Sequence, residues 1–219
     1  MRLLLLFSLS CVGMLFGLPA KAVEVLAVEY PPFTSHREQD GGLAFQILRS
    51  AYPQITFKPL FLPPKRAYTQ IKSGNWCLSF YPAPQGVVAE SIALSKNQLV
   101  IGLVRLQQQT SFRWSSLDEL HGQTVAMLRT GEDSAFSQQF SSGGLQVVYA
   151  ETVRQALELV LRGRADLAMF DSFNFARLAP AEKARLQFSE NQLVKTPIRL
   201  FSNPHCTEQL PPPATLAEF

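Results

Sequence analysis

The chain has 219 residues, of which 47% are hydrophobic and 17% are charged. This length and apolar content allow one or two domains with a packed core, which excludes disorder as the main state. Twenty Lys and Arg residues stand against 17 Asp and Glu residues, and the basic residues form no run. A nucleic-acid partner is therefore not expected.

Residues 1–22 have the parts of a secretory signal peptide. Arg2 supplies a positive start, residues 3–18 are mostly apolar, and small residues stand at positions 20 and 22. The apolar stretch is shorter than the roughly 20 residues of a spanning helix. We expect cleavage after Ala22, which leaves 197 of the 219 residues as a periplasmic protein. Lipidation at Cys11 is the weaker alternative.

Removal of Cys11 leaves two cysteines, Cys77 and Cys206. An even pair in an oxidising compartment is typical of a disulfide. The alternative is two unrelated thiols, one in a strand and one near a frayed end. The sequence leaves both interpretations open.

The first half of the mature chain alternates between strands and helices. Pro64 suits the first turn of a helix, and Ser73-Gly74 is a typical stop. The expected order is a strand, a helix, a strand, a helix and a strand, at 23–28, 43–51, 55–61, from Pro64 to Ser73, and 76–81. This alternation indicates parallel α/β structure.

The pattern then restarts in the second half. The clearest helix is Val153–Arg162, with a capping box of Thr152 and Gln155 before it and Gly163 after it. The other expected elements are an extended run at 99–106, helical turns at 115–120, strands at 124–128, 145–149 and 166–170, a helix at 131–140, and an extended region at 192–202. A second α/β unit is therefore expected.

Two extended segments, Leu99–Leu106 and Val194–Leu200, would join the two units. We expect two Rossmann-like lobes, each with its own sheet, on either side of a cleft that the carboxyl ends of the strands face. The expected division is a signal peptide at 1–22, lobe 1 at 23–97 plus 201–219, and lobe 2 at 98–200 including both crossings.

No catalytic or metal-binding motif is present. The chain has no HExxH, GxSxG, GxGxxG or P-loop sequence, and its three histidines stand alone, at positions 36, 121 and 205. We therefore expect no metal site and no cofactor, and we do not expect an enzyme.

Several segments together resemble the periplasmic solute-binding proteins of family 3, the amino-acid-type branch of the bilobed binding proteins. They include VEVLAVEYPPFTS, LPPKRAYTQIKSGNWCLSFYP, SSLDELHGQTVAML and GRADLAMFD, in the family's order along nearly the whole mature chain. The resemblance implies two lobes, a hinge of two strands and closure around a small ligand. It also implies a monomer that delivers its ligand to the membrane subunits of an ABC-type transporter.

The resemblance places an aromatic residue of the site after the first strand, at Tyr30 or Phe33 in the Y-P-P-F run. An aromatic ring offers an apolar surface or holds a cation over its face. The alternative is that these rings only cover the core. Arg66, in the P-K-R-A run, offers a two-pronged contact to a carboxylate, or is a solvated arginine on a helix.

Asp171 matches the position at which amino-acid binders hold the ammonium group of the ligand. Its alternative role is the N-cap of a helix that begins at Ser172, and a carboxylate can do both. Arg129 and Thr130 match a loop whose backbone N–H groups meet the ligand's carboxylate. A capping box of Thr130 with Asp133 is the alternative.

One departure from the family concerns the segment after the third strand, which starts at Tyr81. Amino-acid binders carry an arginine there that holds the α-carboxylate, whereas residues 81–88 contain neither Arg nor Lys. Either Arg66 or Arg129 replaces it, or the ligand is not an ordinary α-amino acid. The ligand is therefore not carried over from the family.

The leading hypothesis is a binding protein for a small polar or zwitterionic ligand, with Tyr81 and the six residues above in its site. One alternative is a sensor that presents its closed state to a membrane receptor. Another is an enzyme on the same fold, such as a dehydratase.

Overall fold

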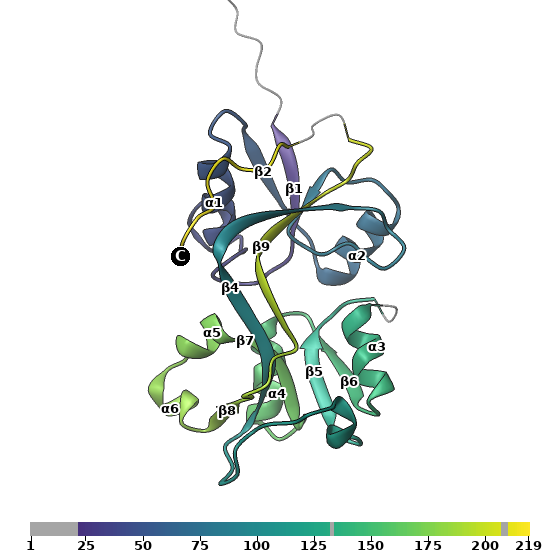
Figure 1. The fold of residues 1–219 in the computed structure, drawn as a ribbon, viewed down its shortest axis with the longest axis vertical. Helices are drawn as coiled ribbons and strands as arrows, with labels where there is room; N and C mark the ends of the chain where they lie inside the picture. Colours follow the sequence, from purple (N-terminus) through teal and green to yellow (C-terminus); the bar gives the residue numbers. More distant parts are fainter. Residues whose placement is uncertain (1–21, 132–133, 207–209) are drawn as a thin grey trace, which may run out of the picture.

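The computed structural model describes residues 22–131, 134–206 and 210–219. The predicted signal peptide, except Ala22, lies outside the described residues. The described chain forms two lobes stacked along the long axis of the molecule (Figure 1). Two long antiparallel strands, β4 (Glu90–Leu106) and β9 (Val194–Ser202), run from one lobe into the other.

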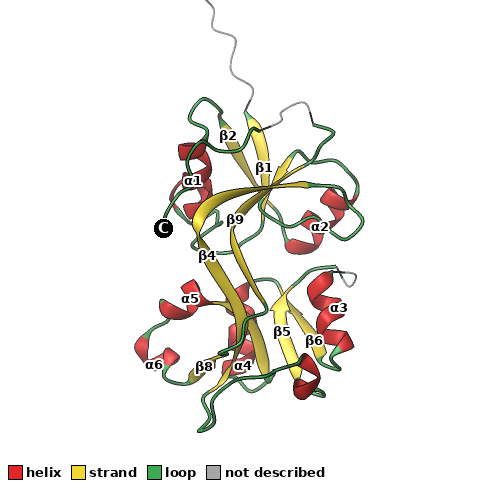
Figure 2. Ribbon diagram, in the orientation of Figure 1, coloured by secondary structure: helices red, strands yellow, loops and turns green. Residues whose placement is uncertain are grey.

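Lobe 1 contains a parallel three-stranded sheet. Its centre is β1 (Val23–Ala27), flanked by β2 (Phe57–Phe61) and β3 (Leu78–Ser79). Helix α1 (Leu43–Ala51) and helix α2 (Pro64–Lys72) lie on different sides of this sheet (Figure 2). Because side chains alternate along β1, Val23, Val25 and Ala27 pack in one apolar cluster and Leu26 packs in another on the opposite face.

Strand β3 is shorter than the predicted strand at 76–81. The carbonyl of Trp76 accepts a hydrogen bond from the side chain of Asn203 at 2.9 Å instead of extending the ladder. At the other end, the hydroxyl of Ser79 bonds both the N–H and the carbonyl of Tyr81, which turns the chain. Local side-chain bonds therefore end the strand on both sides.

Lobe 2 repeats the arrangement, with β5 (Thr124–Leu128) between β6 (Gln146–Ala150) and β7 (Leu167–Asp171), all parallel. The predicted alternation of strands and helices is confirmed in both lobes. The remaining elements are α3 (Ala135–Ser142), α4 (Val153–Leu161), α5 (Ser172–Ala176), α6 (Pro180–Lys183), β8 (Leu186–Phe188) and the short 3-10 helices η1 (Gln39–Gly41) and η2 (Leu117–Leu120).

The two main helices of lobe 2 begin at capping residues. Thr152 caps α4 as predicted, because its hydroxyl accepts a hydrogen bond from the N–H of Gln155 at 3.1 Å. The predicted start of the previous helix at Gly131 is wrong. Helix α3 begins after Ser134, whose hydroxyl accepts from the N–H of Ser137. Thr130 is therefore not the cap, and its predicted partner Asp133 lies outside the described residues.

The expectation of two separate sheets is wrong. Hydrogen bonds run without interruption in the strand order β2-β1-β3-β9-β4-β7-β5-β6, and β8 pairs with β4. The reason is that β4 and β9 stay paired while they pass between the lobes. Each strand therefore belongs to the sheet of both lobes, and the chain remains bilobed (Figure 1).

The pairing of β4 with β9 is irregular at one point. Ala93 pairs with Arg199 and Gln98 pairs with Pro197, so residues 94–97 of β4 lie opposite the single residue Ile198. The hydroxyl of Ser95 accepts a hydrogen bond from the N–H of Ile198 at 2.9 Å, which replaces a ladder bond. A bulge of this kind bends a strand. The bend precedes the predicted crossing at Leu99–Leu106, most of which pairs inside lobe 2.

No helix among residues 22–131, 134–206 and 210–219 is both long and apolar enough to cross a membrane.

Cys77 and Cys206 form a disulfide in the structure, with their Cα atoms 5.5 Å apart. The bond connects the start of β3 to the segment after β9 across 129 positions of sequence. A link of this span removes much of the conformational freedom of the unfolded chain.

We expect reduction of this disulfide to lower the free energy of unfolding by about 4–5 kcal/mol, because the unfolded chain regains a long open loop. Thermal unfolding with and without reductant measures the effect, and the melting temperature should fall by roughly 10 °C or more. A variant with both Cys77→Ser and Cys206→Ser is the control and should not respond to reductant. Free alkylation of both thiols in the native protein would contradict the expectation.

Candidate functional site

The carboxyl ends of the parallel strands define one region between the lobes. Because β1, β2 and β3 are parallel, their carboxyl ends lie on the same side of lobe 1. The same holds for β5, β6 and β7 in lobe 2. Each of these sides faces the other lobe (Figure 1). Six of the predicted site residues end a strand or lie in the loop that follows one: Tyr30, Phe33, Tyr81, Arg129, Thr130 and Asp171. The seventh, Arg66, lies in the helix α2 that follows β2.

Tyr30 and Asp171 meet across the lobes. Tyr30 lies in the loop after β1, and Asp171 is the last residue of β7. The Tyr30 hydroxyl donates a hydrogen bond to Oδ2 of Asp171 at 2.8 Å, although the two residues are 141 positions apart. The structure thus joins an aromatic residue and a carboxylate that the sequence proposed separately.

The carboxylate of Asp171 is completely buried and accepts three hydrogen bonds. Oδ1 accepts from the backbone N–H of Asn174, which makes Asp171 the N-cap of α5. Oδ2 accepts from the side-chain amide of Asn174 and from Tyr30, each at 2.8 Å. A buried carboxylate requires such partners, because losing its hydration is costly. The N-cap role of Asp171 is confirmed, and its role toward a ligand stays a prediction.

The hydroxyl of Tyr30 is held in its neutral form. Burial, the negative charge of Asp171 and the hydrogen bond to it raise the pKa of Tyr30 well above the ordinary value for tyrosine. Tyr30 is therefore a proton donor to Asp171 throughout the neutral and mildly alkaline range.

Tyr81 makes a second contact between the lobes. Its hydroxyl donates to the backbone carbonyl of Arg129 at 3.2 Å. Burial raises the pKa of Tyr81, and the neighbouring Tyr68 and Tyr149 raise it further. The contact thus also depends on a neutral tyrosine.

The Arg129 side chain already has a partner within lobe 2. Its Nε donates to Glu151 at 2.6 Å, and its guanidinium lies 5.6 Å from the centre of the Tyr149 ring. Both members of the ion pair are partly exposed. A ligand carboxylate would have to compete with Glu151 for this cation.

Thr130 belongs to a chain of hydroxyl groups at the start of α3. Its hydroxyl lies 2.8 Å from that of Ser134 and 3.1 Å from that of Ser137. Ser137 in turn lies 2.8 Å from the Tyr149 hydroxyl. These groups satisfy one another, and the adjacent Glu132 and Asp133 lie outside the described residues.

Phe33 is buried and packs with two aromatic rings from other parts of the chain. Its ring centre lies 5.1 Å from that of Phe173 on α5 and 5.9 Å from that of Phe219. Phe173 and Phe219 are also 5.9 Å apart. Phe33 therefore belongs to an aromatic cluster that includes both lobes, rather than to lobe 1 alone.

Arg66 lies in the first turn of α2 and is exposed. In the part of the chain that the structure describes, its guanidinium has no hydrogen-bond or ion-pair partner. Among the two predicted substitutes for the missing arginine, Arg66 is thus the one whose charge is uncommitted.

Sequence reasoning missed several residues that contact the predicted ones. Asn174 stands three positions after Asp171, and this spacing is the available signal, since a polar residue there often reaches back to a cap. Phe173 and Tyr149 gave no signal, because their partners Phe33 and Ser137 come together only in the folded chain.

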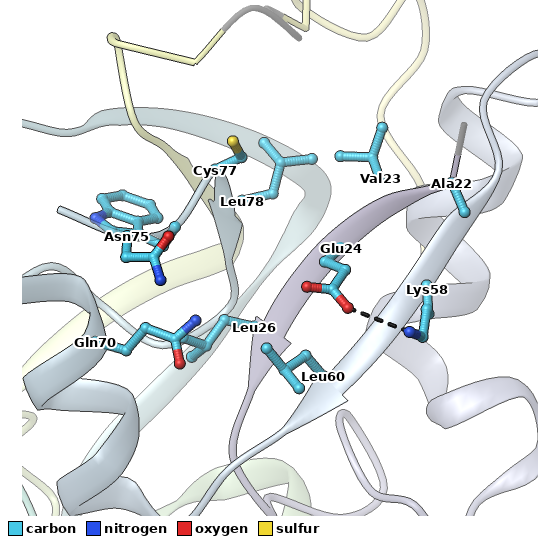
Figure 3. A pocket seen from close by; sticks show the side chains of 11 residues that line it. Ala22, Val23, Glu24, Leu26, Lys58, Leu60, Gln70, Asn75, Cys77 and Leu78 are labelled. Carbon is cyan, nitrogen blue, oxygen red and sulfur yellow. Dashed lines mark hydrogen bonds and ion pairs between the residues drawn. The ribbon is translucent and has the colours of Figure 1, made fainter. Parts of the chain in front are cut away.

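Two surface hollows, of about 510 and 490 Å³, lie elsewhere. The first covers the sheet of lobe 1 beside α2, where Glu24 and Lys58 form an ion pair at 3.2 Å (Figure 3). The second is lined by the Arg113–Glu190 ion pair and by Trp114. Neither hollow is lined by a predicted site residue. Within the described ranges, no group of three or more His, Cys, Asp or Glu residues is arranged for a metal ion.

The fold is similar to that of several solved ligand-binding domains. The ligand-binding core of GluR0 from Nostoc punctiforme, in complex with L-glutamate, has 17% sequence identity and a TM-score of 0.61, with 84% of this chain and 85% of that chain covered. Arginine-bound, truncated ArgBP from T. maritima has 18% identity and a TM-score of 0.62, with 84% and 88% covered.

The VFT2 domain of BvgS from Bordetella pertussis, a double mutant, has 19% identity and a TM-score of 0.54, with 82% of this chain and 78% of that chain covered. No protein-family model and no curated protein sequence matches the chain. The chain therefore has the bilobed type II periplasmic binding-protein fold that the resemblance to solute-binding family 3 implied.

The tyrosine environments predict the alkaline behaviour of the protein. Because Tyr30 and Tyr81 have raised pKa values, unfolded tyrosines should lose their protons first, and stability should fall as the pH rises above about 10. Near-ultraviolet absorbance at about pH 11 should show fewer ionised tyrosines in the native than in the unfolded protein. A Tyr30→Phe variant should leave the native signal unchanged. Loss of one tyrosine from that signal would contradict the assignment.

Proposed function

We propose that the protein is an exported solute-binding protein that captures a small polar or zwitterionic, amino-acid-like ligand between its lobes. Ligand binding would favour the closed form of a hinged molecule, and no chemical step is involved. The site would consist of the seven predicted residues, with Asp171 for a cationic group and Tyr30 for the body of the ligand.

One observation carries this proposal. The Tyr30 hydroxyl and the Asp171 carboxylate, which come from opposite lobes, lie 2.8 Å apart at the carboxyl ends of their strands. A ligand between the lobes would therefore contact both residues at once. Its binding energy would then depend on the position of one lobe relative to the other. A binding protein that closes on its ligand requires this coupling between ligand binding and lobe position.

The charges favour a ligand with a cationic end. Asp171 is a buried carboxylate. A second carboxylate, Glu29, directly precedes Tyr30 in the sequence and contacts the His36 ring. Arg66 is the proposed partner for an anionic end, because Arg129 is paired with Glu151. An arginine held to a carboxylate by two hydrogen bonds gives a strong, directional contact.

The export route, the partner and the lobe boundaries complete the proposal. Cleavage after Ala22 would release the mature chain into the periplasm, where it would act as a monomer with the membrane subunits of an ABC-type transporter. Lobe 1 would comprise residues 23–97 and 201–219, and lobe 2 residues 98–200. The irregular pairing at residues 94–97 supports a hinge at this boundary.

A sensor that presents its closed form to a membrane receptor is the second candidate. The similarity to the VFT2 domain of BvgS, whose periplasmic domain is also similar, favours it. The two functions share the same ligand site and differ in the membrane protein that recognises the closed form. A pull-down of the purified protein with transporter or receptor subunits encoded nearby would separate them.

A thermal-shift screen with amino acids, polyamines and small acids tests the binding function. A ligand at 100 times its dissociation constant should add about 2.7 kcal/mol, which raises the melting temperature by roughly 5–10 °C. Asp171→Asn keeps a capping side chain but removes the charge, so it should abolish the shift for amines. Tyr52→Phe, which removes a hydroxyl bond to the carbonyl of Pro211 within lobe 1, should lower stability by about 1 kcal/mol and keep the shift. A full shift with Asp171→Asn would remove Asp171 from the site.

Arg66→Ala tests the proposed anionic end. Arg66 is exposed, so the substitution should change the stability of the free protein by less than about 0.5 kcal/mol. It should weaken the binding of carboxylate-bearing ligands at least tenfold while binding of simple amines persists. Lys65→Ala, the adjacent exposed cation, is the matched control in a calorimetric titration. Equal effects of the two variants would show that only general charge is involved.

A further inference from the structure

The lobes touch through side chains that the proposed site would need for its ligand. Tyr30 bonds Asp171, and Tyr81 bonds the carbonyl of Arg129. Each pair has one residue in each lobe. In each contact a group of one lobe bonds directly to a group of the other.

The hydrogen bonds of Asp171 differ in how easily they can be exchanged. Both bonds from Asn174 are made within the first turn of α5, so they do not depend on the relative position of the lobes. The bond from Tyr30 comes from the other lobe and breaks when the lobes separate. A cationic group of a ligand would therefore reach Asp171 at the position that Tyr30 holds.

The segment Ala217–Phe219 adds a third connection beside the bend of β4. The N–H of Ala217 donates to the carbonyl of Leu94, and the N–H of Phe219 donates to the side chain of Asn97 at 3.0 Å. Both acceptors lie where β4 passes between the lobes. The Phe219 ring then contacts Phe33 of lobe 1 and Phe173 of lobe 2. Aromatic contacts of this kind stabilise an interface beyond the area that they bury.

We propose that the protein closes without a ligand and that Tyr30 is the latch, so that a ligand carrying a primary amine or another cation binds by displacing the Tyr30 hydroxyl from Asp171. The Tyr81–Arg129 bond and the cluster of Phe33, Phe173 and Phe219 hold the same closed state. The choice of a cationic ligand rests on the proposed function, whereas closure without a ligand does not.

Removing a contact from a binding site usually weakens ligand binding, whereas removing this latch is expected to strengthen it. Only the form in which Tyr30 has left Asp171 can bind the ligand. The observed affinity is therefore the intrinsic affinity of that form multiplied by the fraction of molecules that adopt it. Removing the Tyr30 hydroxyl should therefore strengthen ligand binding. If the hydroxyl instead served as a ligand contact, the same change would weaken binding.

Small-angle X-ray scattering of the ligand-free protein tests the closure. Unmodified protein should be compact, and a variant with both Tyr30→Phe and Tyr81→Phe should have a larger radius of gyration. Tyr52→Phe is the matched control, because it removes a hydroxyl bond that lies within lobe 1, to the carbonyl of Pro211. Circular dichroism establishes that each variant is folded. An unchanged radius in the double variant would overturn the latch.

Calorimetric titration with L-arginine, L-glutamate and putrescine tests the displacement. The Tyr30→Phe variant should bind the amines that the unmodified protein binds about tenfold more tightly, since a hydrogen bond to a charged group no longer competes. Equal or weaker binding would overturn displacement by the ligand. Binding of none of the three probes by either protein would count against the proposed function, and the scattering result would still decide the closure.

Discussion

The pairing of β4 with β9 is the constraint on which the rest of the structure depends. These antiparallel strands belong to the sheets of both lobes, so they fix which strand ends face each other. The same two strands are irregular where they pass between the lobes, with residues 94–97 opposite Ile198. The pairing of β4 with β9 on both sides of this bulge holds the two lobes together, and the bulge itself is a place at which the strands can bend.

The candidate site follows from this arrangement. Because the strands within each lobe are parallel, their carboxyl ends and the starts of the following helices lie at one edge, which faces the other lobe. Loops at such edges place polar groups and helix N-termini around a common region. Tyr30 and Asp171 are an example: Tyr30 lies in the loop after β1 of lobe 1, Asp171 is the last residue of β7 in lobe 2, and the two side chains share a hydrogen bond.

The polar groups of this region satisfy one another in the structure. Asp171 has three donors, Arg129 has Glu151, and the Thr130 hydroxyl has two serine hydroxyls. Buried groups need such partners whether or not a ligand is present. Any ligand must therefore replace hydrogen bonds that the protein groups already make with one another. Its affinity is the difference in free energy between the new hydrogen bonds and those that it replaces. Arg66 differs from these groups, because its side chain is exposed and has no hydrogen-bond or ion-pair partner among the described residues.

The sequence by itself determined the local elements. Periodic apolar residues, capping residues such as Thr152 and Asp171, and the stop at Gly163 act over a few positions, so α4 and the alternating strands were predictable. Only the tertiary structure decided that β4 and β9 form one ladder, that Tyr30 reaches Asp171, and that Phe219 packs against Phe33 and Phe173. These contacts join residues far apart in the chain, and their energies depend on geometry that no local pattern encodes.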